Sequence, residues 1–152
     1  MMETRLHTLG LTLPEPAAPA AHYVPFVVVN NLVFISGQLP MQNGVLQYTG
    51  KANAENIETA KQAAQLCALN ILAQLQVACE NDWDRVLGCV RLGGFVQCNH
   101  DFHQQPQIIN GASELLTHVF GEMGRHARTA VGSNALPLNA MVEIDAIFNI
   151  AY

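Results

Sequence analysis

The chain has 152 residues, the usual size of a single domain, and a domain this long buries roughly 68–70% of the surface that its unfolded chain exposes. Half of the residues are hydrophobic and only 12% are charged, against about 25% in typical soluble domains, so we expect another subunit to cover part of the surface. The formal net charge is −5 and the 7 Lys and Arg residues are scattered, which argues against nucleic-acid binding because that requires clustered positive charge.

The sequence also carries no signal for a membrane or an oxidising compartment. A positively charged start followed by a long apolar block is missing, and no apolar run approaches the roughly 18 residues of a membrane span. Cys67, Cys79, Cys89 and Cys98 lie in apolar, periodic segments, which favours reduced thiols. We therefore expect a cytoplasmic protein without a membrane partner.

Two regions are expected along the chain. Residues 1–22 are interpreted as an extended N-terminal lead-in, because Pro and Ala are frequent over 8–21 and resist both helix and sheet. Residues 23–152 are interpreted as one domain. No repeat of 20 to 50 residues is found in the sequence, which argues against a repeat architecture.

The domain begins with strand signals. β-branched and aromatic residues dominate between Pro25 and Pro40, and Asn30-Asn31 divides them into two strands joined by a tight turn. Asn43-Gly44 marks the next hairpin turn, which leads into a short strand at 45–48.

Two helices are predicted in the middle of the chain. The first runs from the mid-fifties to near Cys79, with Asn53 or Asn56 as its cap, and the second covers 108–120 and ends at Gly121. The first helix is indicated by apolar or small residues at spacings of three and four, namely Ile57, Ala60, Ala64, Cys67, Ile71 and Leu75.

Three strands complete the pattern. Residues 85–96 alternate, with Val86, Val90, Leu92 and Val96 on one face, although their glycines favour a bulge or a close approach. Strands at 128–134 and 141–152 follow. In the last strand Val142, Ile144, Ala146, Phe148 and Ile150 share a face that packs on the helices, while the opposite face carries Met141, Glu143, Asp145, Ile147 and Asn149.

This order of elements predicts a two-layer α+β domain. One mixed sheet of about six strands would have both helices on one face. The uncovered face is then the obvious docking surface for another subunit.

Other chemical motifs are weaker. Cys98, His100 and His103 lie close together, but a fourth ligand at structural-zinc spacing is missing, so no metal site is expected. His22, next to Tyr23, is a candidate general base. The sequence has neither a phosphate-binding glycine loop nor a nucleophile elbow.

Three segments resemble a known family. Phe34-Ile-Ser-Gly-Gln-Leu-Pro40, Ala127-Arg-Thr-Ala-Val131 and Leu136-Pro-Leu-Asn-Ala-Met-Val-Glu-Ile-Asp-Ala146 are similar to the reactive intermediate deaminases, also called Rid, YjgF-like or endoribonuclease L-PSP proteins. The order of elements agrees from about Ala21 onward. Phrases such as Gly124-Arg-His-Ala-Arg128 resemble a branch separate from the best-known deaminases.

The resemblance implies a chorismate-mutase-like fold and a homotrimer with clefts between subunits. It implies hydrolysis of carboxylate-bearing imines and enamines, such as 2-aminoacrylate and 2-iminopropionate, to 2-oxo acids and ammonia. No cofactor and no metal are implied.

The family's site residues can be carried over by position. Arg128 matches the arginine that grips the substrate carboxylate, which suits the bidentate geometry of a guanidinium. Glu143 matches the glutamate that positions water, with Asp145 on the same face as the alternative. Tyr23, Gly37 and Asn110 match residues that bind the substrate.

Two positions depart from the family's pattern. Ala130 stands where well-studied deaminases have a cysteine, and Gly132 stands where they have a glutamate. Ala130 would still line the substrate site. These departures leave open a trimer that binds a keto acid without turning it over. The scattered basic residues disfavour the older label of endoribonuclease or translation inhibitor.

Overall fold

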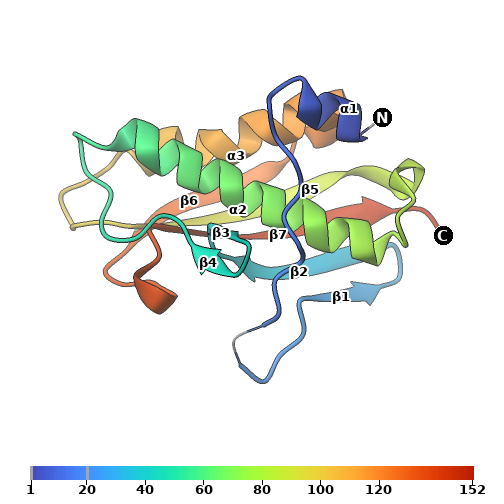
Figure 1. The fold of residues 1–152 in the computed structure, drawn as a ribbon, viewed down its shortest axis with the longest axis horizontal. Coiled ribbons are helices and arrows are strands. Elements are labelled where there is room, and N and C mark those ends of the chain that lie inside the picture. Colours follow the sequence, from blue (N-terminus) through green and yellow to red (C-terminus); the bar gives the residue numbers. More distant parts are fainter. Residues whose placement is uncertain (1, 20) are drawn as a thin grey trace.

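The computed structural model describes residues 2–19 and 21–152, which form two layers (Figure 1). Helices α2 (Ile57–Ala78) and α3 (Gln105–Phe120) lie side by side on one face of a sheet, and no helix covers the other face within the described residues. Both helices occur where they were predicted. Asn56 occupies the N-cap position of α2, but its side chain bonds the preceding loop instead of capping the helix, and Gly121 ends α3 with a φ of 64°.

The sheet has five strands in the order β1-β2-β7-β5-β6, with β5 and β6 parallel and every other pair antiparallel. Its strands are β1 (Phe26–Val29), β2 (Leu32–Gln38), β5 (Val86–Gln97), β6 (Ala127–Ser133) and β7 (Val142–Ile150). Short 3-10 turns lie at Trp83–Arg85 (η1), Gly121–Gly124 (η2) and Pro137–Asn139 (η3).

The expected sixth strand does not join this sheet. Val45–Leu46 (β4) pairs only with Met41–Gln42 (β3), in a separate hairpin that turns at Asn43 and Gly44 with positive φ. The main sheet offers it no edge nearby, because the preceding strand β2 is already paired with β1 on one side and β7 on the other.

The extended lead-in expected over 1–22 is wrong at its start. Met2–His7 form helix α1, whose Met2 and Leu6 are buried one turn apart, and the Arg5 guanidinium donates to the Val119 carbonyl at the end of α3. Residues 11–19 have no regular structure and run across α2 toward β1 (Figure 1), held in part by a 2.9 Å hydrogen bond from Gln74 Nε2 to the Ala17 carbonyl.

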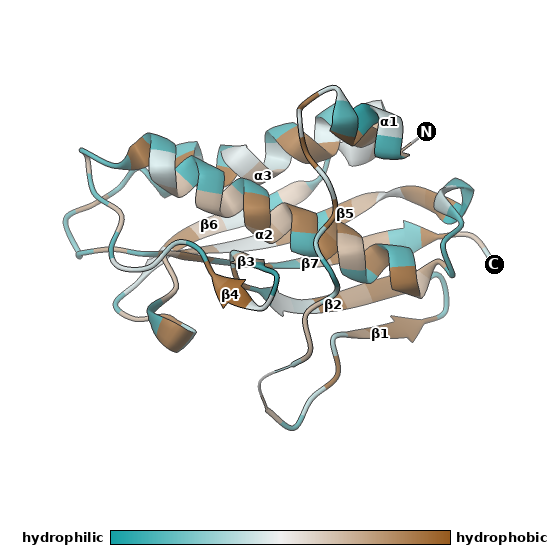
Figure 2. Ribbon diagram, viewed as in Figure 1, coloured by the Kyte–Doolittle hydropathy of each residue, from teal (hydrophilic) through white to brown (hydrophobic). Residues whose placement is uncertain are grey.

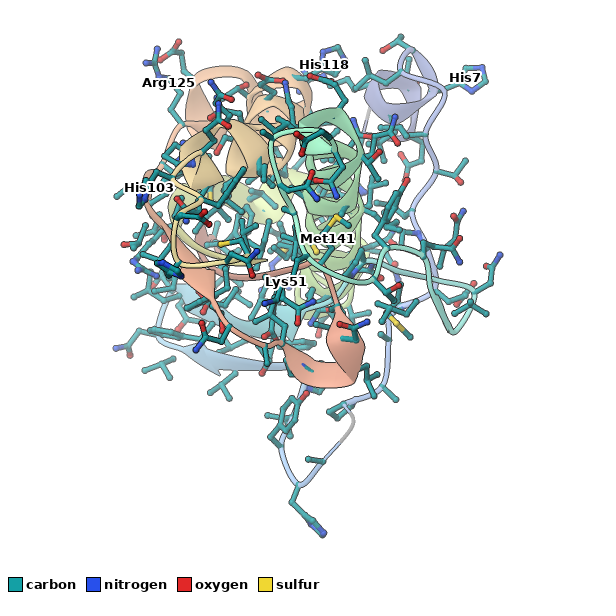
Figure 3. All side chains as sticks on the ribbon, turned by 90° about the vertical axis from the view of Figure 1, so that its left-hand side faces the viewer. His7, Lys51, His103, His118, Arg125 and Met141 are labelled. Atoms are coloured by element: carbon teal, nitrogen blue, oxygen red, sulfur yellow. The ribbon has the colours of Figure 1, made fainter. Side chains whose placement is uncertain are left out.

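The predicted faces of the last strand are confirmed over Val142–Ile150 but are wrong for Met141. Along β7 the residues Val142, Ile144, Ala146, Phe148 and Ile150 are buried beneath the helices, and the residues between them are half-buried. Met141 comes just before β7 and lies inside the molecule, so it does not share the open face (Figure 3).

The prediction for β5 is wrong at one residue. Val90 is exposed and Cys89 is buried in its place, because the pairing of β5 with β7 shifts register between Val86 and Gly88 and again between Cys89 and Arg91. The bulge that the glycines indicated therefore occurs. Between the two register shifts, side chains that would have faced the helices face away from them, and the reverse.

The open face of the sheet has an apolar end. Val27 and Val29 of β1 and Phe34 of β2 are 40–50% exposed, and β1 is coloured as hydrophobic in Figure 2.

The four cysteines are buried and free of disulfides, as predicted. Among the described residues, no helix combines the length and apolarity needed to cross a bilayer.

Gly111 sets the distance between the two long helices. A Cβ atom at this position would clash with the backbone carbonyl of Lys61 on α2, and a backbone atom cannot move aside as the end of a side chain can. The helices pack at this depth because residue 111 has no side chain.

We expect Gly111→Ala to lower the free energy of unfolding by about 1–3 kcal/mol, since the added methyl group forces α3 away from α2. Urea denaturation measures this change. Glu114→Ala, on the exposed side of the same helix, is the control and should change stability by less than about 0.5 kcal/mol. A Gly111→Ala protein as stable as wild type would contradict the packing argument.

Candidate functional site

Arg128 lies on β6, the edge strand next to α3. His126, Arg128 and Ala130 are half-buried on the face that the helices cover, whereas the residues between them are exposed. His103 and Arg125 mark this edge of the molecule in Figure 3. Because side chains of a strand alternate between the two faces of a sheet, Arg128 points toward the helix layer. It does so at the edge of the sheet, since β6 is the last strand in the order.

The guanidinium of Arg128 is held by acceptors on α3. Nη1 donates to Asn110 Oδ1 at 2.8 Å and to Ser113 Oγ at 3.1 Å, and Nη2 donates to the Pro106 carbonyl at 3.1 Å. A guanidinium has five N–H groups, so these three bonds leave two without an acceptor among the described residues. Two parallel N–H groups are what a carboxylate accepts.

The charge of Arg128 is also uncompensated, which sets it apart from three other arginines of the chain. Arg85, Arg91 and Arg125 each form an ion pair with a carboxylate, whereas every acceptor around Arg128 is neutral in residues 2–19 and 21–152. The site therefore offers a positive charge to an anion from outside the chain.

Two residues that the sequence analysis did not single out extend this cluster. Ser113 Oγ lies 2.8 Å from His126 Nε2, and His126 Nδ1 lies 2.6 Å from the Gly124 carbonyl. Burial lowers the pKa of His126, the Gly124 carbonyl opposes this, and the charge of Arg128 lowers the pKa further. Both residues had a signal in the sequence, since His126 lies two residues before Arg128 and Ser113 follows Asn110 by three in a helix.

The two departures from the family pattern lie on this same strand. Ala130 is partly buried against the hydrophobic core, on the same face as Arg128. At Gly132 a Cβ atom would come within 2.8 Å of Cys98 Sγ and 2.9 Å of Gln105 Nε2, so these side chains occupy the space that a larger residue would need.

A second cluster lies on the open face of the sheet. Glu143 on β7 sits against Gly37 of β2, where a side chain at Gly37 would meet its carboxylate. Burial raises the pKa of Glu143, and the nearby charge of Asp145 raises it further. Burial also raises the pKa of Asp145, although Arg91 and the Gly93 backbone oppose this effect.

The contacts of Glu143 and Asp145 separate the two alternatives. Arg91 pairs with Asp145 at 3.7 Å and donates to Thr129 Oγ1 at 3.1 Å. Glu143 has no ion pair or hydrogen bond with the rest of the described chain. Asp145 is therefore engaged within the chain, whereas Glu143 is the carboxylate left for a ligand or a water molecule.

Tyr23 lies near the second cluster. It is 49% exposed and borders a hollow of about 90 Å³ that Gly37 also lines. His22 is exposed, and no partner of its side chain is found among the described residues. Cys98, His100 and His103 line another hollow, but the described residues contain no group of three possible ligands that could hold a metal ion.

Within one copy, the two clusters do not form one site. Arg128, Asn110 and Ala130 lie on the helix side at the β6 edge, and Glu143 and Gly37 lie on the open face. Strands β2 and β6 are three strand spacings apart, or roughly 14 Å, and the two clusters also lie on opposite faces of the sheet. The sequence predicted these residues but could not show that the sheet separates them.

Comparison with known proteins identifies the family to which this chain belongs. The model of the YjgF/chorismate-mutase-like endoribonuclease family matches residues 3–149. The chain belongs to this Rid/YjgF-like family. The Trypanosoma cruzi protein TCP17 is 44% identical over 144 residues, which are 93% of this chain and 89% of that protein.

Solved structures of family members are similar over nearly the whole chain. The Agrobacterium tumefaciens protein Atu1372, whose function is described as unknown, is 48% identical with a TM-score of 0.92 and an alignment covering 99% of this chain and 92% of that one. RidA from a Psychrobacter species is 26% identical with a TM-score of 0.61, over 92% of this chain and 97% of that one. This Rid-like backbone is thus more similar to the Agrobacterium protein than to that RidA.

The raised pKa of Glu143 predicts a pH-dependent stability. A carboxyl group whose pKa is higher in the folded state stabilises the fold below its ordinary pKa of 4.5, and this contribution is lost as the pH rises through the raised value. We expect Glu143→Gln to gain stability relative to wild type as the pH increases from 4.5 toward neutrality, measured by urea denaturation at each pH.

The control for this measurement is Glu122→Gln, which changes a glutamate whose side chain is 90% exposed. Its stability should follow that of wild type across the same pH range. A difference between Glu143→Gln and wild type that does not vary with pH would contradict the assignment.

Proposed function

We propose that this Rid-like protein hydrolyses small imines and enamines that carry a carboxylate, of the 2-aminoacrylate and 2-iminopropionate type, to 2-oxo acids and ammonia. The observation that carries the proposal is Arg128, whose guanidinium is oriented by Asn110, Ser113 and Pro106 and keeps two N–H groups for a ligand. A small 2-imino acid presents the carboxylate that such a fork binds in two parallel hydrogen bonds.

The chemical step requires a water molecule and a base. Water adds to the carbon of the protonated imine and gives up a proton, and Glu143 is the carboxylate suited to receive it. Its pKa is raised by burial, which makes the ionised form a stronger base than an exposed glutamate. Tyr23 and Gly37 would line the side of the cleft from which the water arrives.

The site would be shared between copies of the chain in a homotrimer. A ligand at Arg128 cannot meet Glu143 of the same copy, because the sheet lies between them. A second copy that applies its open face to the β6 edge of the first would bring the two residues together. The exposed valines of β1 and Phe34, together with the low charged fraction, support the burial of this face in an assembly.

We expect Arg128→Ala to reduce kcat/KM for 2-iminopropionate roughly 100-fold or more, because two charge-assisted hydrogen bonds to the substrate are lost. The imino acid is generated in the assay by an amino-acid oxidase, and its hydrolysis is followed in competition with semicarbazide. Thermal unfolding of the variant should stay near wild type, since Arg128 is only partly buried.

Arg125→Ala is the matched control, because Arg125 lies three residues away and is 73% exposed, with Glu122 as its ion-pair partner. It should retain wild-type activity. Equal activity of Arg128→Ala and wild type would refute the proposal.

Calorimetric binding of 2-oxobutyrate without any imine hydrolysis would favour a ligand-binding role, with which Ala130 is consistent. RNA cleavage that disappears in Arg128→Ala would favour the endoribonuclease reading.

The shared cleft predicts complementation between two inactive variants. Arg128→Ala and Glu143→Gln should each be inactive alone, but their co-expression should restore measurable activity, because some clefts then combine an intact Arg128 with an intact Glu143 from another copy. Both proteins carry different affinity tags, so that mixed assemblies are purified and assayed. Mixed assemblies as inactive as the parents would argue that one copy supplies both residues.

A further inference from the structure

Ser113 and His126 form a hydrogen-bonded pair directly beside the Arg128 guanidinium. Ser113 comes from α3 and His126 from the residue just before β6, and the serine oxygen contacts both the histidine ring at 2.8 Å and Arg128 Nη1 at 3.1 Å. Both residues are half-buried. The pair therefore lies against Nη1 of the guanidinium that binds a carboxylate in the proposed function.

The hydrogen bonds define where the protons lie. The Gly124 carbonyl only accepts, so His126 Nδ1, at 2.6 Å, must carry a proton. In the neutral ring Nε2 is then the acceptor, and it receives the Ser113 hydroxyl proton. The guanidinium only donates, so it bonds a lone pair of the same oxygen. Ser113 is thus oriented to pass a proton toward His126.

The charges around His126 favour the neutral ring. Burial disfavours the charged ring, and the positive charge of Arg128 two residues away acts in the same direction, so the pKa of His126 lies below its ordinary value of 6.5. The charged residues of the adjacent elements are engaged elsewhere. Glu114 of α3 pairs with Lys61, and Glu122 of η2 pairs with Arg125.

We propose that Ser113 and His126 are the proton acceptor for the second half of the reaction, with Ser113 in contact with the substrate and His126 taking the proton through it. This inference rests on the proposed function, and it assigns a role at a site where Ala130, on the same face of β6, has no group that can exchange a proton.

The proton transfers balance in two steps. Water adds to the protonated imine carbon, its proton goes to Glu143, and a neutral carbinolamine forms. Glu143 then returns that proton to the amino nitrogen, and the C–N bond breaks to release ammonia. As the C=O bond forms, the hydroxyl proton passes to Ser113 Oγ while the serine proton moves to His126 Nε2. His126 finally releases one proton to water, which restores the site.

Kinetics of three variants test the pair. Ser113→Ala should lower kcat for 2-iminopropionate roughly 100-fold, with little change in KM, whereas Ser113→Thr should retain most of the rate because it keeps the hydroxyl. His126→Gln keeps hydrogen-bonding groups but cannot take up a proton. Its kcat should be similarly low, and the fall of kcat on acidification that His126 causes, below pH 6.5 in wild type, should disappear.

Thr117→Ala is the control, because it removes a hydroxyl one turn further along α3 that bonds only backbone carbonyls of its own helix. It should match wild type in rate and pH profile. A kcat of Ser113→Ala within about twofold of wild type, equal losses in Ser113→Ala and Ser113→Thr, or an unchanged pH profile in His126→Gln would each overturn the inference. Inactivity of wild type toward every imino acid would instead overturn the proposed function, and this inference with it.

Discussion

The close contact of α3 with α2 at Gly111 is the constraint on which the Arg128 cluster depends. Asn110 and Ser113 lie on either side of this glycine, so the depth to which α3 packs fixes the height of both side chains above β6. The apolar side of the same helix is buried in the core. The same short stretch of α3 thus packs against α2 on one side and orients the Arg128 guanidinium on the other.

Neutral acceptors around Arg128 have a specific physical consequence. Hydrogen bonds restrict the rotamers of the guanidinium, which reduces the conformational entropy that a ligand would have to remove on binding. A carboxylate in the same place would also orient the side chain, but it would cancel the charge. The cluster on α3 therefore combines orientation with an available positive charge, the combination that anion recognition requires.

Under the proposed function, the arrangement of the sheet makes assembly part of the chemistry. The faces of a sheet are separated by the backbone, so Arg128 and Glu143 of one copy cannot act on the same small molecule. If the open face is covered by a second copy, the burial that raises the pKa of Glu143 increases further, since more water is excluded from the carboxylate. Formation of the interface and the basicity of Glu143 are then coupled.

Much of the fold was predictable from the sequence. Period-3.6 patterns located α2 and α3, alternation located β7 and its buried face, and positive-φ turn residues such as Asn43 and Gly44 marked the hairpins. These features depend on neighbours within a few residues, which a pattern can register. The burial of Val90 was predicted wrongly because a bulge depends on the pairing with the partner strand, which the local pattern does not contain.

The sequence by itself determined the family, marked Arg128 and Glu143 as candidate site residues, and gave the order of the two long helices and the five main strands along the chain, because short motifs and local periodicity carry that information. Only the tertiary structure decided that these two residues face opposite sides of the sheet, that Asp145 is paired with Arg91, and that Ser113 meets His126. Each of these facts depends on contacts between segments far apart in the chain. Strand order and helix packing create such contacts, and no local pattern specifies them.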